Sequence, residues 1–360
     1  MSDRFCRGRA RPEASGLVRR AFLGLATAGL VWLAASCSGQ STPAAQPAPA
    51  GAATAAPPTR LPLQYGTISK TAWGWPLLVA LNKGFFTAAG LEVELTLFRT
   101  PPNGAQLLTA GSLDLASINP ETVIRSVNNG APMVMIASDS NDAPYSFIVR
   151  PEIRTWAELR GKTFPGSGPR EQTTVWLKKI LAANGLQEDE YEIVMVGATP
   201  ERLAALRSGA AAGALVAQPQ DFELLAEGYR RLAMLSEYLP AHPIAVHAGR
   251  TDWMQAHPGE TVAALRAVRE GVRWLYDAAN REEAVAILAR EINVSEAIAR
   301  QTYELLVEQL RLWSPDLELP PETVQKSITF MAEIGELTPP LPPPSRYMDR
   351  RFLEELHRGG

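Results

Sequence analysis

Cysteine is almost absent from this sequence, which has 2 cysteines, Cys6 and Cys37, in 360 residues. Both precede the part with globular composition, so that part has no disulfide framework and no cysteine site for a metal. The 4 histidines lack the spacing of metal ligands, and the sequence contains no nucleophile-elbow or phosphate-binding glycine motif. We therefore expect no metal, no cofactor and no catalytic residues, and we predict that the protein is not an enzyme.

Long hydrophobic runs and excess positive charge are also missing. The apolar segment 21–33 is about 13 residues long, whereas a membrane-spanning helix needs about 20. The formal net charge of −3 excludes a protein that binds nucleic acid through bulk positive charge. A basic start followed by a short apolar segment is instead typical of a signal peptide, which we place at residues 1–36.

Two short motifs near the N-terminus indicate export and lipid attachment. The pair Arg19 and Arg20 resembles the twin-arginine export motif, and the residues ending in Cys37 resemble a bacterial lipobox, where the cysteine is acylated. Residues 37–60 are rich in Ala and Pro and predict a flexible tether. We expect a periplasmic domain anchored to a membrane through Cys37. The alternatives are general secretory export and cleavage that leaves a soluble periplasmic protein.

From Leu61 onward, short apolar runs alternate with amphipathic segments of about 10 to 15 residues, a pattern typical of an α/β fold with parallel strands. The four residues from Thr155 to Glu158 form a capping box, which predicts a short helix. The apolar runs predict strands at 63–67, 93–97, 113–118, 133–137, 145–149, 192–196, 214–217 and 244–248. The main helices are expected at 104–110, 121–128, 172–184, 201–208, 282–291, 296–310 and 321–334.

Several segments resemble one protein family in their order and spacing. They are Ala80 to Phe86 with Gly90 to Val93, Gly104 to Leu108 with Ala110 to Asp114, Trp156 to Lys162, and Arg202 to Gly209. Through them, residues 61–357 resemble the periplasmic substrate-binding proteins of ABC transporters, in the group that serves sulfonates, taurine, nitrate and thiamine precursors. The resemblance covers most of the chain, although no single segment is specific.

This resemblance implies a type II periplasmic-binding-protein fold, in which two doubly wound α/β lobes are joined by a two-segment hinge. Lobe 1 would comprise residues 61–149 and 246–357, and lobe 2 residues 150–245, with the ligand between them. It also implies a monomer with a small-molecule ligand, and a transporter permease and ATPase as partners. The alternative is a biosynthetic enzyme for thiamine pyrimidine with the same fold, but the related fungal enzymes use a Cys-rich segment that this body lacks.

The candidate site follows from the expected sheet. Loops at the carboxyl ends of parallel strands lead into helices, whose N-termini offer free N–H groups and a positive dipole end to a ligand. Such loops lie at 69–75, 102–104, 119–121 and 166–170. From these loops and the segment before Pro219, we select as ligand-binding candidates Ser69, Lys70, Thr71, Trp73, Asn103, Asn119, Ser167, Arg170 and Gln218.

Two ligand classes remain open at this point. Lys70, Ser167 and Arg170 favour a sulfonate or similar organic anion, because charged and hydroxyl donors bind oxyanions. The indole of Trp73 favours an aromatic or pyrimidine ligand, because its faces stack on planar groups. Some candidates also have a purely structural explanation, since Asn103 suits a helix cap.

Overall fold

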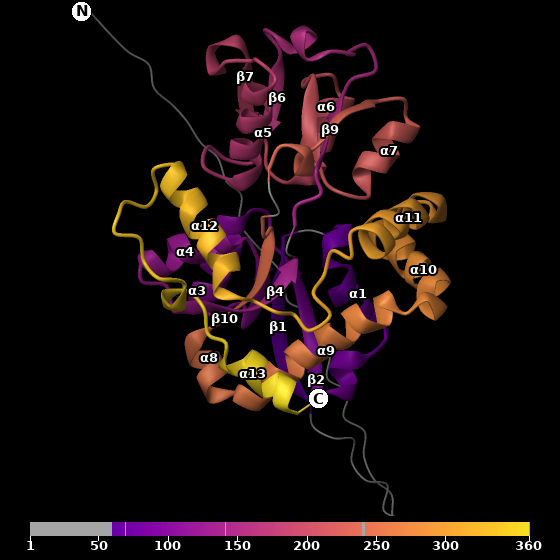
Figure 1. Cartoon of the computed structure of the whole chain (residues 1–360). Helices are drawn as coiled ribbons and strands as arrows, with labels where there is room; N and C mark the ends of the chain where they lie inside the picture. Colours follow the sequence, from indigo (N-terminus) through magenta and orange to yellow (C-terminus); the bar gives the residue numbers. More distant parts are fainter. Residues whose placement is uncertain (1–59, 69, 141, 240–241, 360) are drawn as a thin grey trace, which may run out of the picture. The chain divides into compact units, whose positions relative to one another are not determined.

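The computed structural model describes residues 60–68, 70–140, 142–239 and 242–359 (Figure 1). The predicted signal peptide, with Arg19 and Arg20, and the predicted acylation site Cys37 lie outside the described residues, as does Ser69. Within the described ranges, no helix combines the length and the apolar character needed to cross a membrane.

Five strands form the larger sheet, in the spatial order β2 (Leu91–Leu97), β1 (Leu61–Thr67), β3 (Leu115–Ile118), β10 (Ala245–Arg250) and β4 (Met133–Ser140). The first three run parallel, with Leu61 opposite Leu91 and Tyr65 opposite Leu115. β10 is antiparallel to both of its neighbours. The carboxyl ends of β1, β2 and β3 therefore meet at one edge of this sheet.

Helices cover both faces of the larger sheet. Leu115 and Ala116 are consecutive residues of β3, yet they belong to different apolar clusters, because alternate side chains of a strand point to opposite faces. One face packs against α1 (Trp75–Asn82), α2 (Phe85–Ala88), α8 (Thr251–Ala256), α9 (Pro258–Tyr276), α10 (Arg281–Ile292), α11 (Glu296–Tyr303) and α13 (Arg351–Arg358). The other packs against α3 (Pro101–Ala110), α4 (Pro120–Asn128) and α12 (Pro321–Glu333).

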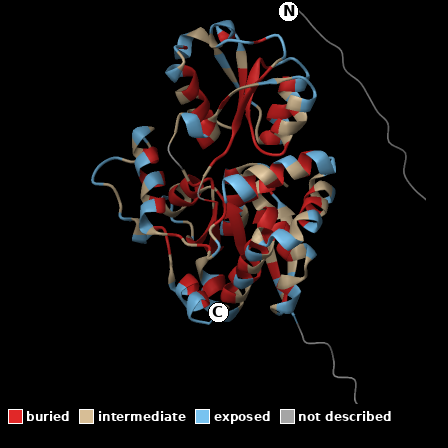
Figure 2. Ribbon diagram, turned by 45° about the vertical axis from the view of Figure 1, so that its right-hand side comes forward, coloured by how far each residue is buried: buried red, intermediate tan, exposed pale blue. Residues whose placement is uncertain are grey.

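The remaining strands form two smaller sheets. One is antiparallel, in the order β8 (Gly213–Val216), β5 (Ser146–Val149) and β9 (Arg230–Met234), and the other pairs β6 (Thr163–Gly166) in parallel with β7 (Glu192–Met195). Their helices are α5 (Gln172–Ala183), α6 (Thr199–Arg207) and α7 (Gln220–Ala226). Buried residues concentrate on the sheets and on the inner faces of the helices (Figure 2). The fold is thus an α/β fold with one five-stranded sheet and two smaller sheets.

We call residues 60–140 with 242–359 the large-sheet half, and residues 142–239 the small-sheet half. The expected boundary at residue 149 needs correction, because β5 pairs with β8 and β9 rather than with the larger sheet. The chain leaves the larger sheet after Ser140 and enters the small-sheet half by Ser146. We propose that these two halves are the lobes, with the first crossing before β5.

Local sequence explains where several elements begin. Helix α3 starts at Pro101, before the expected Gly104, because the Thr100 hydroxyl accepts a hydrogen bond from the Asn103 N–H at 3.3 Å and proline suits the first helical position. The capping box at Thr155 is confirmed, since the Glu158 carboxylate accepts from the Thr155 N–H at 3.1 Å. The expected helix 296–310 divides into α11 and a π-helical turn at Glu304–Gln309. Neither α7 nor β9 was predicted.

Candidate ligand-binding site

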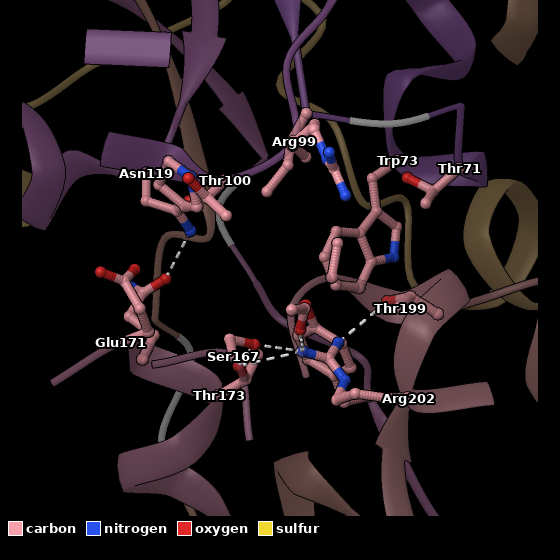
Figure 3. Close-up of a pocket in the computed structure, with 16 residues that line it drawn as sticks. Thr71, Trp73, Arg99, Thr100, Asn119, Ser167, Glu171, Thr173, Thr199 and Arg202 are labelled. Carbon is pink, nitrogen blue, oxygen red and sulfur yellow. Dashed lines mark hydrogen bonds between the residues drawn. The ribbon is translucent and has the colours of Figure 1, made fainter. Parts of the chain in front are cut away.

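A pocket lies where the two halves meet (Figure 3). The large-sheet half lines it with Ile68, Thr71, Trp73, Arg99, Thr100, Pro101 and Asn119. The small-sheet half lines it with Tyr145, Ser167, Glu171, Gln172, Thr173, Gly197, Ala198, Thr199 and Arg202. A ligand in this pocket would contact both halves at once.

Four helices begin at the pocket. Thr100 and Asn119 precede α3 and α4 in the large-sheet half, while Glu171 and Ala198 precede α5 and α6 in the small-sheet half. The first N–H groups of a helix have no partner inside the helix, and the dipole places partial positive charge there. The helix starts therefore make the pocket favourable for a negatively charged group.

Arg202 is the most unusual side chain of the pocket, because its residue is only 2% exposed. Its guanidinium donates to the Leu215 carbonyl at 3.0 Å and the Gly197 carbonyl at 3.3 Å. It also donates to the hydroxyls of Thr199 at 2.9 Å and Thr173 at 3.2 Å, and to the Ser167 hydroxyl. Every one of these acceptors in the described chain is a neutral oxygen.

A buried cation whose hydrogen-bond acceptors are all neutral has consequences for binding. Burial lowers the pKa of Arg202, and Tyr145 and the charge of Glu201 partly offset that shift. Removal from water disfavours the charged form, yet arginine stays protonated in proteins. A buried charge is costly unless it meets an opposite charge. An anion that enters the pocket would supply that opposite charge, and the planar guanidinium fork suits carboxylate, sulfonate or another oxyanion.

Two aromatic rings form the wall beside this cation. Trp73 meets Tyr145 edge to face with ring centres 4.5 Å apart, and the Arg202 guanidinium lies 5.8 Å from the centre of the Tyr145 ring. The Trp73 N–H donates to the buried Gln218 amide oxygen at 3.4 Å, and Gln218 does not line the pocket. The polar atom of the indole is thus engaged outside the pocket, which leaves an apolar ring surface toward it.

A hydrogen bond also connects the halves at the other side of the pocket. The Asn119 amide donates to the Gln172 side-chain oxygen of the small-sheet half at 2.8 Å, and it also donates to the Ile244 carbonyl within its own half at 2.9 Å. Next to them, Glu171 lies 3.7 Å from the Arg125 guanidinium, and Figure 3 shows its carboxylate directed away from Arg202. Burial raises the pKa of Glu171, which Arg125 partly offsets. The pocket therefore has its acidic group on the side away from Arg202.

Four of the predicted site residues line the pocket, namely Thr71, Trp73, Asn119 and Ser167. Ser167 accepts from Arg202, and Asn119 bridges the halves, as described above. Their roles in ligand binding stay predictions. The structure therefore supports the placement of the site at the helix starts, while leaving the ligand open.

The other predicted residues in the described chain do not line the pocket, because each is engaged elsewhere. Lys70 pairs with Glu291 at 2.9 Å, and Asn103 accepts from the Arg99 N–H at 3.4 Å at the start of α3. The side chain of Arg170 is 74% exposed and faces Glu336 at 3.8 Å. Gln218 is fully buried and donates to the Pro144 carbonyl. Arg170 thus lies outside the pocket, and the buried arginine that lines it is Arg202.

Sequence analysis missed Arg99, Tyr145 and Arg202 as pocket residues. The sequence did contain a signal for Arg202. Helix α6 begins just after the parallel strand β7, so the rule that selects helix starts after parallel strands also applies to it. Arg202 was noted only as part of a family motif. Tyr145 was interpreted as a strand residue, and nothing in its local sequence indicates that Trp73 packs against it.

Among the described residues, no group of three or more His, Cys, Asp or Glu side chains is arranged to hold a metal ion.

The fold, with a pocket between its two halves, is that of periplasmic binding proteins. The model of the NMT1/THI5 like family matches residues 74–283, which is more than half of the chain. The chain therefore belongs to the NMT1/THI5 like family.

Comparison with known proteins gives both sequence relatives and structural neighbours. The nitrate/nitrite binding protein NrtA of Nostoc is 26% identical over 277 residues, an alignment that covers 68% of this chain and 61% of that protein. The chain thus spans about three fifths of that relative's length. A ligand-binding component of an ABC-type import system from Staphylococcus aureus is structurally similar, with a TM-score of 0.69, 16% identity, and coverage of 82% of this chain and 99% of that one.

Two further solved structures share the fold. The alkanesulfonate-binding protein SsuA of Xanthomonas axonopodis, bound to MOPS, has a TM-score of 0.64 and 17% identity, covering 82% of this chain and 100% of that one. The desulfurization enzyme DSZB has a TM-score of 0.62 and 16% identity, covering 84% of this chain and 100% of that one. At these identities the likeness shows the fold alone, and the fold occurs in both binding proteins and an enzyme.

Proposed function

We propose that this protein is the solute-binding component of an ABC importer and that it captures a small anion in the pocket between its halves. The observation that carries the proposal is the buried guanidinium of Arg202, whose acceptors in the described chain are all neutral. The four helix starts around the pocket add to the positive potential. The names of the relatives and neighbours above, which include nitrate-binding and alkanesulfonate-binding proteins, support an oxyanion as the solute.

Binding would act through closure of the two halves. The anion would contact Arg202 in the small-sheet half and the N-terminal ends of α3 and α4 in the large-sheet half. A ligand that contacts both halves binds the closed conformation more tightly than the open one. It therefore shifts the population toward the closed conformation, by an amount set by the ratio of the two affinities. The loaded conformation would then be the one presented to a transporter permease and its ATPase. No chemical step on the solute is part of this function.

The location we propose for this activity is the periplasm. Arg19 and Arg20 within a basic start support export, and the lipobox-like segment before Cys37 supports anchoring to a membrane. The Ala- and Pro-rich residues 37–60 would act as a flexible tether between that anchor and the binding domain. This part of the proposal rests on the sequence, since residues 1–59 lie outside the described structure.

The experiment is isothermal titration of the purified protein with nitrate, bicarbonate, methanesulfonate and benzenesulfonate, using Arg202→Lys and Arg207→Lys as a matched pair. Both arginines lie on α6, but Arg207 pairs with Glu227 on the outer surface and does not line the pocket. Loss of hydrogen bonds to a charged group costs about 1.5–3 kcal/mol. Arg202→Lys is therefore expected to weaken anion binding about 10- to 150-fold, and Arg207→Lys to leave it unchanged.

Arg202 also holds backbone carbonyls, so its variant must be shown to fold. The melting temperature serves as that check, and Ser167→Ala provides a second pocket variant that leaves the guanidinium in place. If none of the four anions binds, or if Arg202→Lys and Ser167→Ala bind anions as the unmodified protein does, the proposed site is wrong. Conversion of a bound solute, detected by mass spectrometry, would replace the binding function with an enzymatic one.

A further inference from the structure

We propose that the preferred solute is an aromatic carboxylate or sulfonate, in which the anionic group is attached directly to a flat apolar ring. This inference rests on the proposed function and specifies its ligand class. It is carried by two kinds of group that line the pocket side by side: the donors around Arg202, and the rings of Trp73 and Tyr145, the second of which lies next to the Arg202 guanidinium. A ligand that matches both parts must itself have a charged end and a planar apolar end.

The buried charge of the pocket belongs to Arg202 in the small-sheet half, whereas the exposed Arg99 lines the pocket from the large-sheet half. The hydroxyls of Ser167, Thr173 and Thr199 all accept hydrogen bonds from Arg202. A hydroxyl that accepts one hydrogen bond still has a proton to donate. The Ser167 and Thr173 hydroxyls also share a hydrogen bond of 2.5 Å, so one of these two protons and the Thr199 proton stay available for ligand oxygens. The guanidinium and the hydroxyls together form a compact set of donors for a group with two or three oxygen atoms.

The apolar end is formed mainly by Trp73 and Tyr145, with Ile68 and Pro101 beside them. The Trp73 N–H points to Gln218 rather than into the pocket, so the indole offers a hydrocarbon face there. The ring of Tyr145 is held edge-on to that indole at 4.5 Å, and Trp73 is only half-buried. Figure 3 shows Arg99, Trp73 and Arg202 directed toward the same space.

A small inorganic ion would leave this wall unused. Nitrate or bicarbonate has no apolar surface to bury, so its affinity would come from the donors around Arg202 alone. An aliphatic sulfonate would bury little area against the rings. An aromatic ring gains twice, because it removes a large apolar area from water and makes edge or face contacts with the indole. The geometry thus favours aromatic over aliphatic and inorganic anions.

The test compares anions that share a headgroup and differ in the ring. Benzenesulfonate and methanesulfonate, benzoate and acetate, and nitrate are titrated into the purified protein at constant ionic strength. We expect each aromatic anion to bind at least about 10-fold more tightly than its aliphatic counterpart, the effect of burying one apolar ring. The two headgroup pairs then report whether the carboxylate or the sulfonate is preferred.

Variants of Trp73 and Arg202 test the contributions of the aromatic wall and of the anion-binding groups separately. Trp73→Leu keeps an apolar side chain but removes the flat face, so it is expected to reduce the aromatic-to-aliphatic affinity ratio about 5-fold or more, and Trp73→Phe is expected to restore most of that ratio. Arg202→Lys should weaken both members of a pair equally and leave the ratio unchanged. A role of Trp73 in folding alone would lower the melting temperature without changing the ratio, and that result would overturn the inference.

Two further outcomes distinguish this inference from the proposed function. If methanesulfonate, acetate or nitrate binds as tightly as the aromatic anions, the ligand class inferred here is wrong while anion capture stands. If no anion binds and a neutral aminopyrimidine does, both the inference and anion capture fail. If aromatic and aliphatic anions bind with equal affinities that fall in Arg202→Lys but not in Trp73→Leu, the aromatic wall has a structural role only.

Discussion

The indole of Trp73 and the ring of Tyr145 meet edge to face, with their centres 4.5 Å apart, although they come from different halves of the molecule. Trp73 lies in the 3-10 turn Ala72–Gly74 before α1, and Tyr145 immediately precedes β5. The Trp73 carbonyl also accepts from the Trp313 indole at 2.8 Å. The turn that presents Trp73 is thus hydrogen-bonded to both halves, because the Ala72 N–H donates to the Gln218 carbonyl of the small-sheet half at 3.2 Å. Any movement between the halves must change this contact.

Arg99 and Arg202 give the first prediction. They line the same pocket from different halves, and two cations in one pocket repel each other when no anion lies between them. In Arg99→Glu the new carboxylate would act as a built-in anion for Arg202. We expect this variant to have a smaller radius of gyration than the ligand-free unmodified protein in small-angle X-ray scattering, and to lose anion affinity.

Arg99→Gln is the control for that experiment, because it removes the charge without adding a carboxylate. Arg99 is exposed, so neither substitution disturbs a buried contact. An Arg99→Glu protein with the same radius of gyration as Arg99→Gln would contradict the idea that charge across the pocket governs closure.

The second prediction concerns the helix that follows the Trp73 turn. Gly271 of α9 packs so closely against α1 that an added Cβ would lie 2.3 Å from the Pro76 carbonyl oxygen, a backbone atom. Gly271→Ala is expected to lower the free energy of unfolding by about 1–3 kcal/mol, the usual cost of overpacking. Gly259→Ala in the first turn of the same helix meets no atom within 4 Å.

Gly259→Ala is therefore the matched control, and we expect it to raise the stability by up to about 1 kcal/mol, because alanine loses less backbone entropy on folding. Denaturant unfolding of both variants measures the difference. Equal stabilities for the two would mean that α1 and α9 are packed less closely than the structure indicates.

The sequence predicted the fold well where local pattern determines structure. Alternating apolar residues located β1 and β2, and the capping box at Thr155 was confirmed. The boundary between the halves was misplaced because the apolar run of β5 does not reveal which sheet it joins. That choice depends on its pairing with β8 and β9, two strands that lie far along the chain.

Part of the pocket lining could be predicted from the sequence, but the arginine buried in that lining could not. The rule of helix starts after parallel strands selected Asn119 and Ser167, and both line the pocket. The same rule did not distinguish Arg170, which lies outside the pocket, from Arg202, which lines it. Both arginines lie near helix starts, but only tertiary packing buries Arg202 and leaves Arg170 exposed to solvent.

The third prediction concerns pH and the buried His247. Its Nδ1 lies 2.5 Å from the Tyr65 hydroxyl oxygen, and burial lowers the pKa of the imidazole, which the charge of Asp139 partly offsets. An unfolded histidine has a pKa of about 6.5. Because the folded pKa is lower, the unfolded chain takes up the proton first as the pH falls. Stability from a neutral His247 is present above about pH 6.5 and is lost below it.

His247→Gln isolates this effect, since glutamine has no charge to gain. Unfolding of both proteins between about pH 8 and pH 5.5 is expected to show the unmodified protein losing stability relative to the variant as the pH falls through the histidine range. A stability difference that stays constant over this range would show that His247 titrates alike in the folded and unfolded states.

The fourth prediction concerns the anchor. If Cys37 is acylated, Cys37→Ala should move the protein from the membrane fraction to the soluble periplasmic fraction, because two or more acyl chains are what make membrane anchoring stable. Replacing Arg19 and Arg20 by lysine keeps the charge but removes the twin-arginine pattern, and it should block export. Unchanged membrane partitioning would exclude lipid attachment at Cys37, and normal export of the lysine variant would indicate the general secretory route.

The central claim is that Arg202 holds the anionic group of the solute, and a crystal structure of the protein with 4-bromobenzenesulfonate tests it most directly. We predict sulfonate oxygens within hydrogen-bonding distance of the Arg202 guanidinium and of at least one hydroxyl among Ser167, Thr173 and Thr199. The anomalous signal of the bromine should lie beside the Trp73 indole. A bound sulfonate elsewhere on the molecule, with Arg202 still contacted only by neutral protein oxygens, would contradict the account.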